Sequence, residues 1–171
     1  MLILIFIFAL YIASGFFLLR LIFLNNLVLL QNHWAFSHLV FSILALVGFM
    51  ITLTLGLLYL ASEYNFKKKK TSRFLDKLPP LETLEKLHYT TLYVAFLFFS
   101  AGIITGAGWS KSVTGLYISG DKKQLISFAI WVFFAVFLNI RVFRGWVGRR
   151  GVIFSMIGFL GIIILMLLLQ N

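Results

Sequence analysis

The sequence predicts an all-α fold, a polytopic integral membrane helical bundle with about five transmembrane helices. Of its 171 residues, 61% are hydrophobic and only 12% are charged, whereas about 25% are charged in an average soluble domain. The mean hydropathy is +1.02. Apolar residues gather in five runs, each of about 18 residues or more, long enough for a helix to cross a bilayer. These runs lack the alternation of transmembrane strands, so helices are expected.

The five expected spans form a single membrane domain over residues 1–171 and cover residues 2–19, 34–60, 89–107, 125–142 and 152–169. The first run has no basic segment before it and no cleavage site of small residues before Arg20. It therefore indicates a retained span rather than a signal peptide. After Pro79–Pro80, Glu82 and Glu85 fall where a helix dipole favours acids, which predicts a short helix leading straight into the third span.

The loops between the spans differ sharply in charge. The chain has 15 Lys and Arg against 5 Asp and Glu, a net charge of +10. Eleven basic residues lie in the loop 61–88 or between the fourth and fifth spans, and four lie on the other side. Positive residues stay inside, so residues 61–88 are predicted to form a basic cytoplasmic loop, with the N-terminus cytoplasmic and the C-terminus outside. A bacterial inner (plasma) membrane is the expected location.

The same charges indicate membrane lipid as a partner and no nucleic acid, because basic residues do not alternate with aromatics on a water-exposed face. The chain has no cysteine, which excludes disulfides, thiolate metal sites and covalent haem attachment. No nucleophile–base pair, phosphate-binding glycine loop or dinucleotide fingerprint is present, so the sequence predicts no enzyme. Gly102 and Gly106 form a G-x-x-x-G pattern that predicts a helix–helix contact in the third span.

The three histidines are the candidate functional residues of the chain. His38 lies in the outer third of the second span and shares a helical face with Trp34 and Phe41. An imidazole at membrane depth predicts either a metal ligand or an interhelical hydrogen bond, and the sequence leaves both open. His33 is expected to be solvated in the outer loop. His88 is expected at the membrane interface, at the inner end of the third span.

From about His38 to Leu169 the chain resembles the HemX-like/CcsA family of cytochrome c assembly membrane proteins. After His38 and the basic loop, three blocks follow in that family's order: "LPPLETLEKLHY" (78–89), "SAGIITGAGW" (100–109) and "SFAIWVFFAVFLNIRVFRGWVGRRG" (127–151). The last block is the most specific, with Trp131 and Arg141 at the family's spacing. The resemblance covers about three-quarters of the chain.

The resemblance implies haem (heme) handling at the outer face of the membrane. His38 matches a family histidine and would be the axial ligand, aromatic residues would form an apolar wall, and Lys111, Lys122 or Lys123 would pair with the propionates. The residues implied to bind the cofactor are His38, Trp34, Trp109, Asp121, Lys122 and Lys123, with His38 as the metal ligand. The family's Trp-Asp-Pro-Lys-Glu motif reads "GDKKQ" (120–124) here, and Asn139 stands where many members carry a histidine.

Two functions follow as hypotheses. The first is a membrane protein of cytochrome c-type biogenesis that handles or delivers haem and works with other assembly proteins or an apocytochrome. The second is a non-catalytic membrane regulatory or interaction subunit, HemX-like, that has lost haem binding and uses its basic cytoplasmic face. A transporter is a weaker third possibility, because neither broken helices nor acidic residues within the spans are visible.

Overall fold

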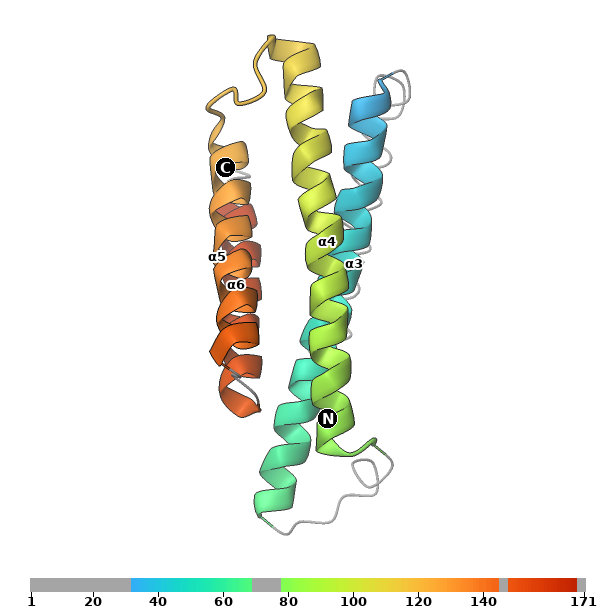
Figure 1. Ribbon diagram of the computed structural model, residues 1–171, viewed down its shortest axis with the longest axis vertical. Coiled ribbons are helices and arrows are strands. Elements are labelled where there is room, and N and C mark those ends of the chain that lie inside the picture. Colours follow the sequence, from blue (N-terminus) through green and yellow to red (C-terminus); the bar gives the residue numbers. More distant parts are fainter. Residues whose placement is uncertain (1–31, 69–77, 145–147, 169–171) are drawn as a thin grey trace.

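The computed structural model describes residues 32–68, 78–144 and 148–168. This part of the chain contains four helices: α3 (His33–Lys67), α4 (Leu81–Thr114), α5 (Lys122–Arg144) and α6 (Arg149–Leu168). They run alternately up and down. The long pair α3–α4 stands beside the shorter pair α5–α6 (Figure 1). The all-α prediction is confirmed for these residues.

Three of these helices are long and apolar enough to cross a membrane: α3, α4 and α5 as far as Phe143. They contain the second, third and fourth expected spans, and α6 occupies the position of the fifth. The first expected span lies outside the described residues, as do Lys69, Lys70, Arg73 and Lys77 of the loop 61–88. The short helix predicted after Pro79–Pro80 is continuous with the third span, since α4 runs unbroken from Leu81 to Thr114.

Local sequence sets the ends of the two long helices. The side chain of Asn32 accepts a hydrogen bond of 3.0 Å from the backbone nitrogen of Trp34 and so caps α3. At the far end of α4, Gly115 adopts φ 78° and its N–H donates to the carbonyl of Lys111 at 2.9 Å. Glycine takes this left-handed conformation without strain, which lets the chain turn back toward α5.

Small residues bring α3 and α4 close together along much of their length. A Cβ atom added at Gly48 of α3 would lie 2.8 Å from the Cβ of Ala95 in α4. On α4, an added Cβ at Gly102 would lie 3.5 Å from the Ser42 side chain, and one at Gly106 would lie 2.9 Å from the His38 ring. The prediction that Gly102 and Gly106 pack at a helix–helix contact is confirmed.

Replacing Gly106 with leucine should therefore destabilise the bundle. The added side chain would have to displace the His38 ring, and overpacking of this kind costs about 1–3 kcal/mol. Thermal unfolding in detergent measures the loss. Gly161→Leu is the matched control, because a Cβ there would meet nothing within 4 Å. Equal melting temperatures for the two variants would contradict the close α3–α4 contact at Gly106.

An aromatic cluster joins all four helices in the middle of the bundle. The Phe49 ring of α3 lies 5.9 Å from Phe99 of α4, 5.1 Å from Phe134 of α5 and 5.9 Å from Phe159 of α6, centroid to centroid. Phe49, Phe134 and Phe159 are buried. Rings packed at these distances fix how the pair α5–α6 docks on the pair α3–α4.

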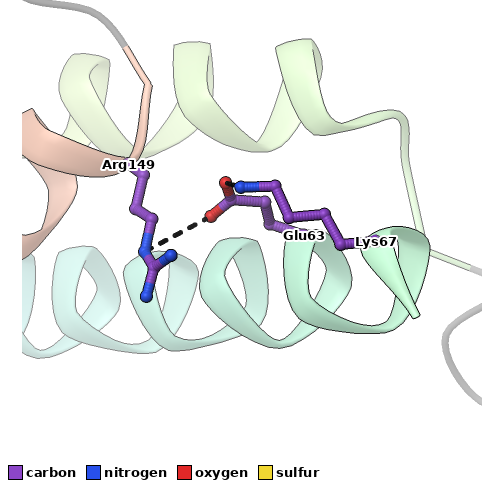
Figure 2. A network of polar contacts seen from close by, with 3 residues as sticks. All are labelled: Glu63, Lys67 and Arg149. Carbon is purple, nitrogen blue, oxygen red and sulfur yellow. Dashed lines mark hydrogen bonds and ion pairs between the residues drawn. The ribbon is translucent and has the colours of Figure 1, made fainter.

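At the end of the bundle where α3 finishes, polar contacts hold the start of α6. One oxygen of the Glu63 carboxylate lies 2.6 Å from Lys67 Nζ, and the other lies 3.8 Å from Arg149 Nε (Figure 2). The backbone N–H of Gly148 donates to Glu85 of α4 at 2.6 Å. Together these contacts tie the first residues of α6 to both α3 and α4. We call this the basic end of the bundle, and the end with His33 and Thr114 the tryptophan end.

Candidate functional site

His38 projects from α3 toward α4 near the tryptophan end. Its Nδ1 lies 2.7 Å from the carbonyl oxygen of Gly102. A carbonyl oxygen can only accept, so Nδ1 carries the proton and donates it. In the neutral ring Nε2 then holds a lone pair, and no group among the described residues donates a hydrogen bond to it. Metal-ligating histidines have this arrangement, with one ring nitrogen fixed to a carbonyl and the other available.

The α4 backbone makes room for this imidazole. Gly106 has no side chain, and a Cβ there would lie 2.9 Å from Nδ1 and 3.0 Å from Cε1 of His38. One turn earlier, Gly102 supplies the carbonyl that holds the ring, and Thr105 Oγ1 donates to the same carbonyl at 3.1 Å. The G-x-x-x-G pattern of α4 therefore has two roles, since it permits close packing and it seats His38.

Two tryptophans flank His38. The ring of Trp109 lies 5.9 Å from the His38 ring, centroid to centroid, at an interplanar angle of 34°. The Trp34 ring lies against Gly108, where an added Cβ would be 2.4 Å from Trp34 Cε3. Trp34 is 50% exposed, Trp109 is 37% exposed and His38 is half-buried. Three residues predicted to bind a cofactor thus lie on neighbouring turns of α3 and α4, and we call them the His38 cluster (Trp34, His38 and Trp109).

The other three predicted binding residues lie elsewhere. Asp121, Lys122 and Lys123 are exposed at the start of α5. No hydrogen bond, ion pair or ring contact joins them to the His38 cluster within the part of the chain that the structure describes. Lys111 is engaged locally, because its Nζ donates to the Tyr117 hydroxyl at 2.9 Å and lies 4.2 Å from that ring's centroid. Of the three lysines expected to pair with propionates, Lys122 and Lys123 are therefore the two that remain available to an acidic group.

His88 has surroundings that the sequence analysis did not predict. It was expected at the membrane interface, but its side chain is fully buried at the junction of α3, α4 and α6. Nδ1 donates to the carbonyl of Thr52 at 2.9 Å, and Nε2 lies 2.9 Å from Ser155 Oγ. The spacing of Leu84, His88, Leu92 and Ala95, all buried on one face of α4, is the signal that would have placed it inside.

The remaining candidates do not form a larger metal site. His33 is exposed, as the sequence predicted. Among the described residues, no group of three or more His, Cys, Asp or Glu side chains could hold a metal ion. His38 offers a single imidazole donor.

Comparison with known proteins decides the family. The sequence model of the family described as cytochrome C assembly protein matches residues 1–171, the whole chain. The chain belongs to this family. With its apolar helices, family membership makes it an integral membrane protein, as the sequence resemblance implied.

Its curated relatives are longer proteins. The cytochrome c biogenesis protein CcsA of Chlamydomonas reinhardtii is 32% identical over 132 residues, which cover 77% of this chain and 36% of that protein. The CcsA protein of Welwitschia mirabilis is 26% identical over 150 residues, covering 75% of this chain and 49% of the relative. The CcsA protein of Prochlorococcus marinus strain MIT 9515 is 39% identical over 83 residues, which cover 48% of this chain and 27% of that protein.

The chain therefore spans less than half the length of each of these family members. No solved structure matches it.

Proposed function

We propose that this chain handles haem at the outer face of the membrane during cytochrome c assembly, with His38 as the iron ligand. The observation that carries the proposal is the state of His38, whose Nδ1 is fixed to the Gly102 carbonyl while Nε2 keeps its lone pair. A single imidazole suits a haem iron, because the porphyrin supplies four further nitrogen ligands. The names of the relatives, cytochrome c biogenesis proteins, support the same process.

The surrounding residues fit this cargo. Trp109 packs beside the His38 ring, and Trp34 extends the aromatic surface on the neighbouring helix. Such side chains provide an apolar wall and keep water from the iron. Lys122 and Lys123, exposed at the start of α5, would pair with the propionates. In this proposal the chain binds, orients and passes on its cargo, and it catalyses no reaction of its own.

The proposal also sets the orientation. The tryptophan end faces outward, and the basic end, with Lys67, Arg149 and Arg150, faces the cytoplasm, because basic residues are retained on the inner side. A bacterial inner membrane is the location proposed. An apocytochrome or another assembly protein would meet the chain at the tryptophan end.

An absorption spectrum of the detergent-purified chain, recorded before and after haem is added, tests the proposal. We expect a Soret band typical of five-coordinate or weakly six-coordinate iron, because the described residues place one imidazole at this site. Titration with increasing haem should saturate at one equivalent. A spectrum identical to that of free haem in the same detergent would refute the proposal.

One observation favours a second candidate, a non-catalytic membrane interaction or regulatory subunit without haem. Asp121, Lys122 and Lys123 make no contact with the His38 cluster in the described part of the chain, so the expected binding residues do not converge. In that case His38 would only form an interhelical hydrogen bond. The distance of 2.7 Å between its Nδ1 and the Gly102 carbonyl oxygen is typical of a strong hydrogen bond. The haem titration separates the two candidates.

A further inference from the structure

A pocket of about 440 Å³ opens between α4 and α5 toward the basic end. It lies at the opposite end of α4 from the turns that contact His38. Four of its lining residues, Glu82, Lys86, Tyr89 and Tyr93, recur at spacings of three and four along α4 and so share one face of that helix. Arg141 lines it from α5. The proposed haem function uses none of these residues.

Arg141 is a cation without an acidic partner. Its guanidinium carbon lies 3.3 Å from the centroid of the Tyr89 ring, and its Nη1 lies 3.5 Å from the Tyr93 hydroxyl. No carboxylate of the described residues comes within ion-pair distance, and the buried Nε has no hydrogen-bond partner. The buried hydroxyl of Tyr89 also lacks a partner. A guanidinium held by aromatic rings and one phenol hydroxyl retains N–H donors for an anion.

The rim of the pocket carries charges of both signs. Lys86 and Glu82 are exposed, and neither takes part in an ion pair within the described ranges. Glu85, also in the lining, is already engaged, because its Oε1 accepts from the Gly148 backbone. The pocket therefore offers two cationic groups, Arg141 and Lys86, and one free carboxylate, Glu82. This set is complementary to a phosphate with an ammonium group attached.

The length of α5 would bring the pocket to the level of lipid headgroups if this helix spans the bilayer. The 23 residues of α5 span about 35 Å, slightly more than the hydrocarbon core, and Arg141 lies three residues from its end. From the pocket residue Thr90, an exposed apolar stripe continues along α4 toward the membrane centre through Val94 and Leu97. A molecule bound by its phosphate at Arg141 would thus have an apolar surface beside it on which to lay an acyl chain.

We propose that this pocket binds the headgroup of a zwitterionic aminophospholipid such as phosphatidylethanolamine. The phosphate lies against Arg141 and Lys86, the ammonium group meets Glu82, and the acyl chain follows Val94 and Leu97. A primary ammonium retains N–H donors for the carboxylate, whereas the trimethylammonium of phosphatidylcholine has none. The pocket therefore selects for the primary amine as well as for the phosphate.

Lipid binding to the full chain, purified in detergent and followed by native mass spectrometry, tests this. We expect phosphatidylethanolamine to bind about fivefold more tightly than phosphatidylcholine or phosphatidylglycerol, the size of effect that one exposed charge pair can produce. Soluble glycerophosphoethanolamine should compete poorly, because it lacks the acyl chain. Competition as strong as that of the lipid, or a preference for phosphatidylglycerol, would overturn the proposal.

Two exposed side chains provide variants that leave the packing of the bundle intact. Glu82→Gln should abolish the preference for phosphatidylethanolamine over phosphatidylcholine while keeping the binding of both. Lys86→Gln should weaken both phospholipids together. Lys68→Gln, which changes an exposed lysine directly after α3 and outside the pocket lining, is the control and should bind both phospholipids as the wild-type chain does. If Glu82→Gln still preferred phosphatidylethanolamine over phosphatidylcholine, the Glu82 carboxylate would not be the group that recognises the amine.

Discussion

Alanine in place of His38 is expected to remove the Soret shift that haem produces with the wild-type chain. Nε2 of His38 carries the lone pair that would bind iron. In the described part of the chain no other imidazole belongs to the His38 cluster, since His88 is buried toward the basic end and His33 is exposed. Loss of the ligand should weaken haem binding at least tenfold, about 1.4 kcal/mol. Spectral titration of the purified variant measures this loss.

His33→Ala is the control, since it removes an exposed imidazole from the same helix only five residues away. Its spectrum and affinity should match those of the wild type. Added imidazole should restore the band in His38→Ala, which a purely structural defect would not permit. A bis-histidine spectrum that survives the loss of His38 would place the ligands elsewhere and overturn the assignment.

Features that depend on spacing along one helix were predictable from the sequence. Pro79–Pro80 and the acids after them marked the start of α4, and the structure begins that helix at Leu81. The G-x-x-x-G spacing of Gly102 and Gly106 predicted a close contact, and the structure places α3 against both glycines. The two alternatives for His38, ligand or hydrogen bond, prove compatible, because one ring nitrogen is fixed and the other keeps its lone pair.

Features that depend on how separate helices meet were not predictable in this way. Hydropathy alone could not tell that Ser155, 67 positions away, would face His88, so the burial of His88 among three helices was not predicted. Likewise, Lys111, Lys122 and Lys123 look equivalent in sequence. In the structure, however, Lys111 donates to the Tyr117 hydroxyl, whereas Lys122 and Lys123 are exposed at the start of α5. The resemblance to a family implied the candidate binding residues as a set, and the structure brings only three of them near one another.

Alanine in place of His88 is expected to cause a large loss of stability. The fully buried ring bridges three helices, with Nδ1 bonded to Thr52 of α3 and Nε2 to Ser155 of α6, each at 2.9 Å. Its truncation loses both hydrogen bonds and leaves a cavity beside Gly56, where an added Cβ would lie 3.1 Å from the His88 ring. Together these losses should lower the free energy of unfolding by about 2–4 kcal/mol. Unfolding of the detergent-solubilised chain by increasing SDS measures the change.

Two further variants separate the cavity from the hydrogen bonds. Leucine at His88 fills most of the volume and leaves neither partner orphaned. Without the imidazole, the Ser155 hydroxyl can donate its one proton to the Val152 carbonyl, which lies 2.8 Å away, and the Thr52 carbonyl can still accept its own helix bond. We therefore expect His88→Leu to recover at least half of the stability lost in His88→Ala. Ser155→Ala removes only the Nε2 contact and should cost about 0.5–1.5 kcal/mol. If His88→Ala unfolds at the wild-type SDS concentration, the junction of α3, α4 and α6 does not depend on this ring; if His88→Leu is as unstable as His88→Ala, the hydrogen bonds and not the packed volume hold the three helices together.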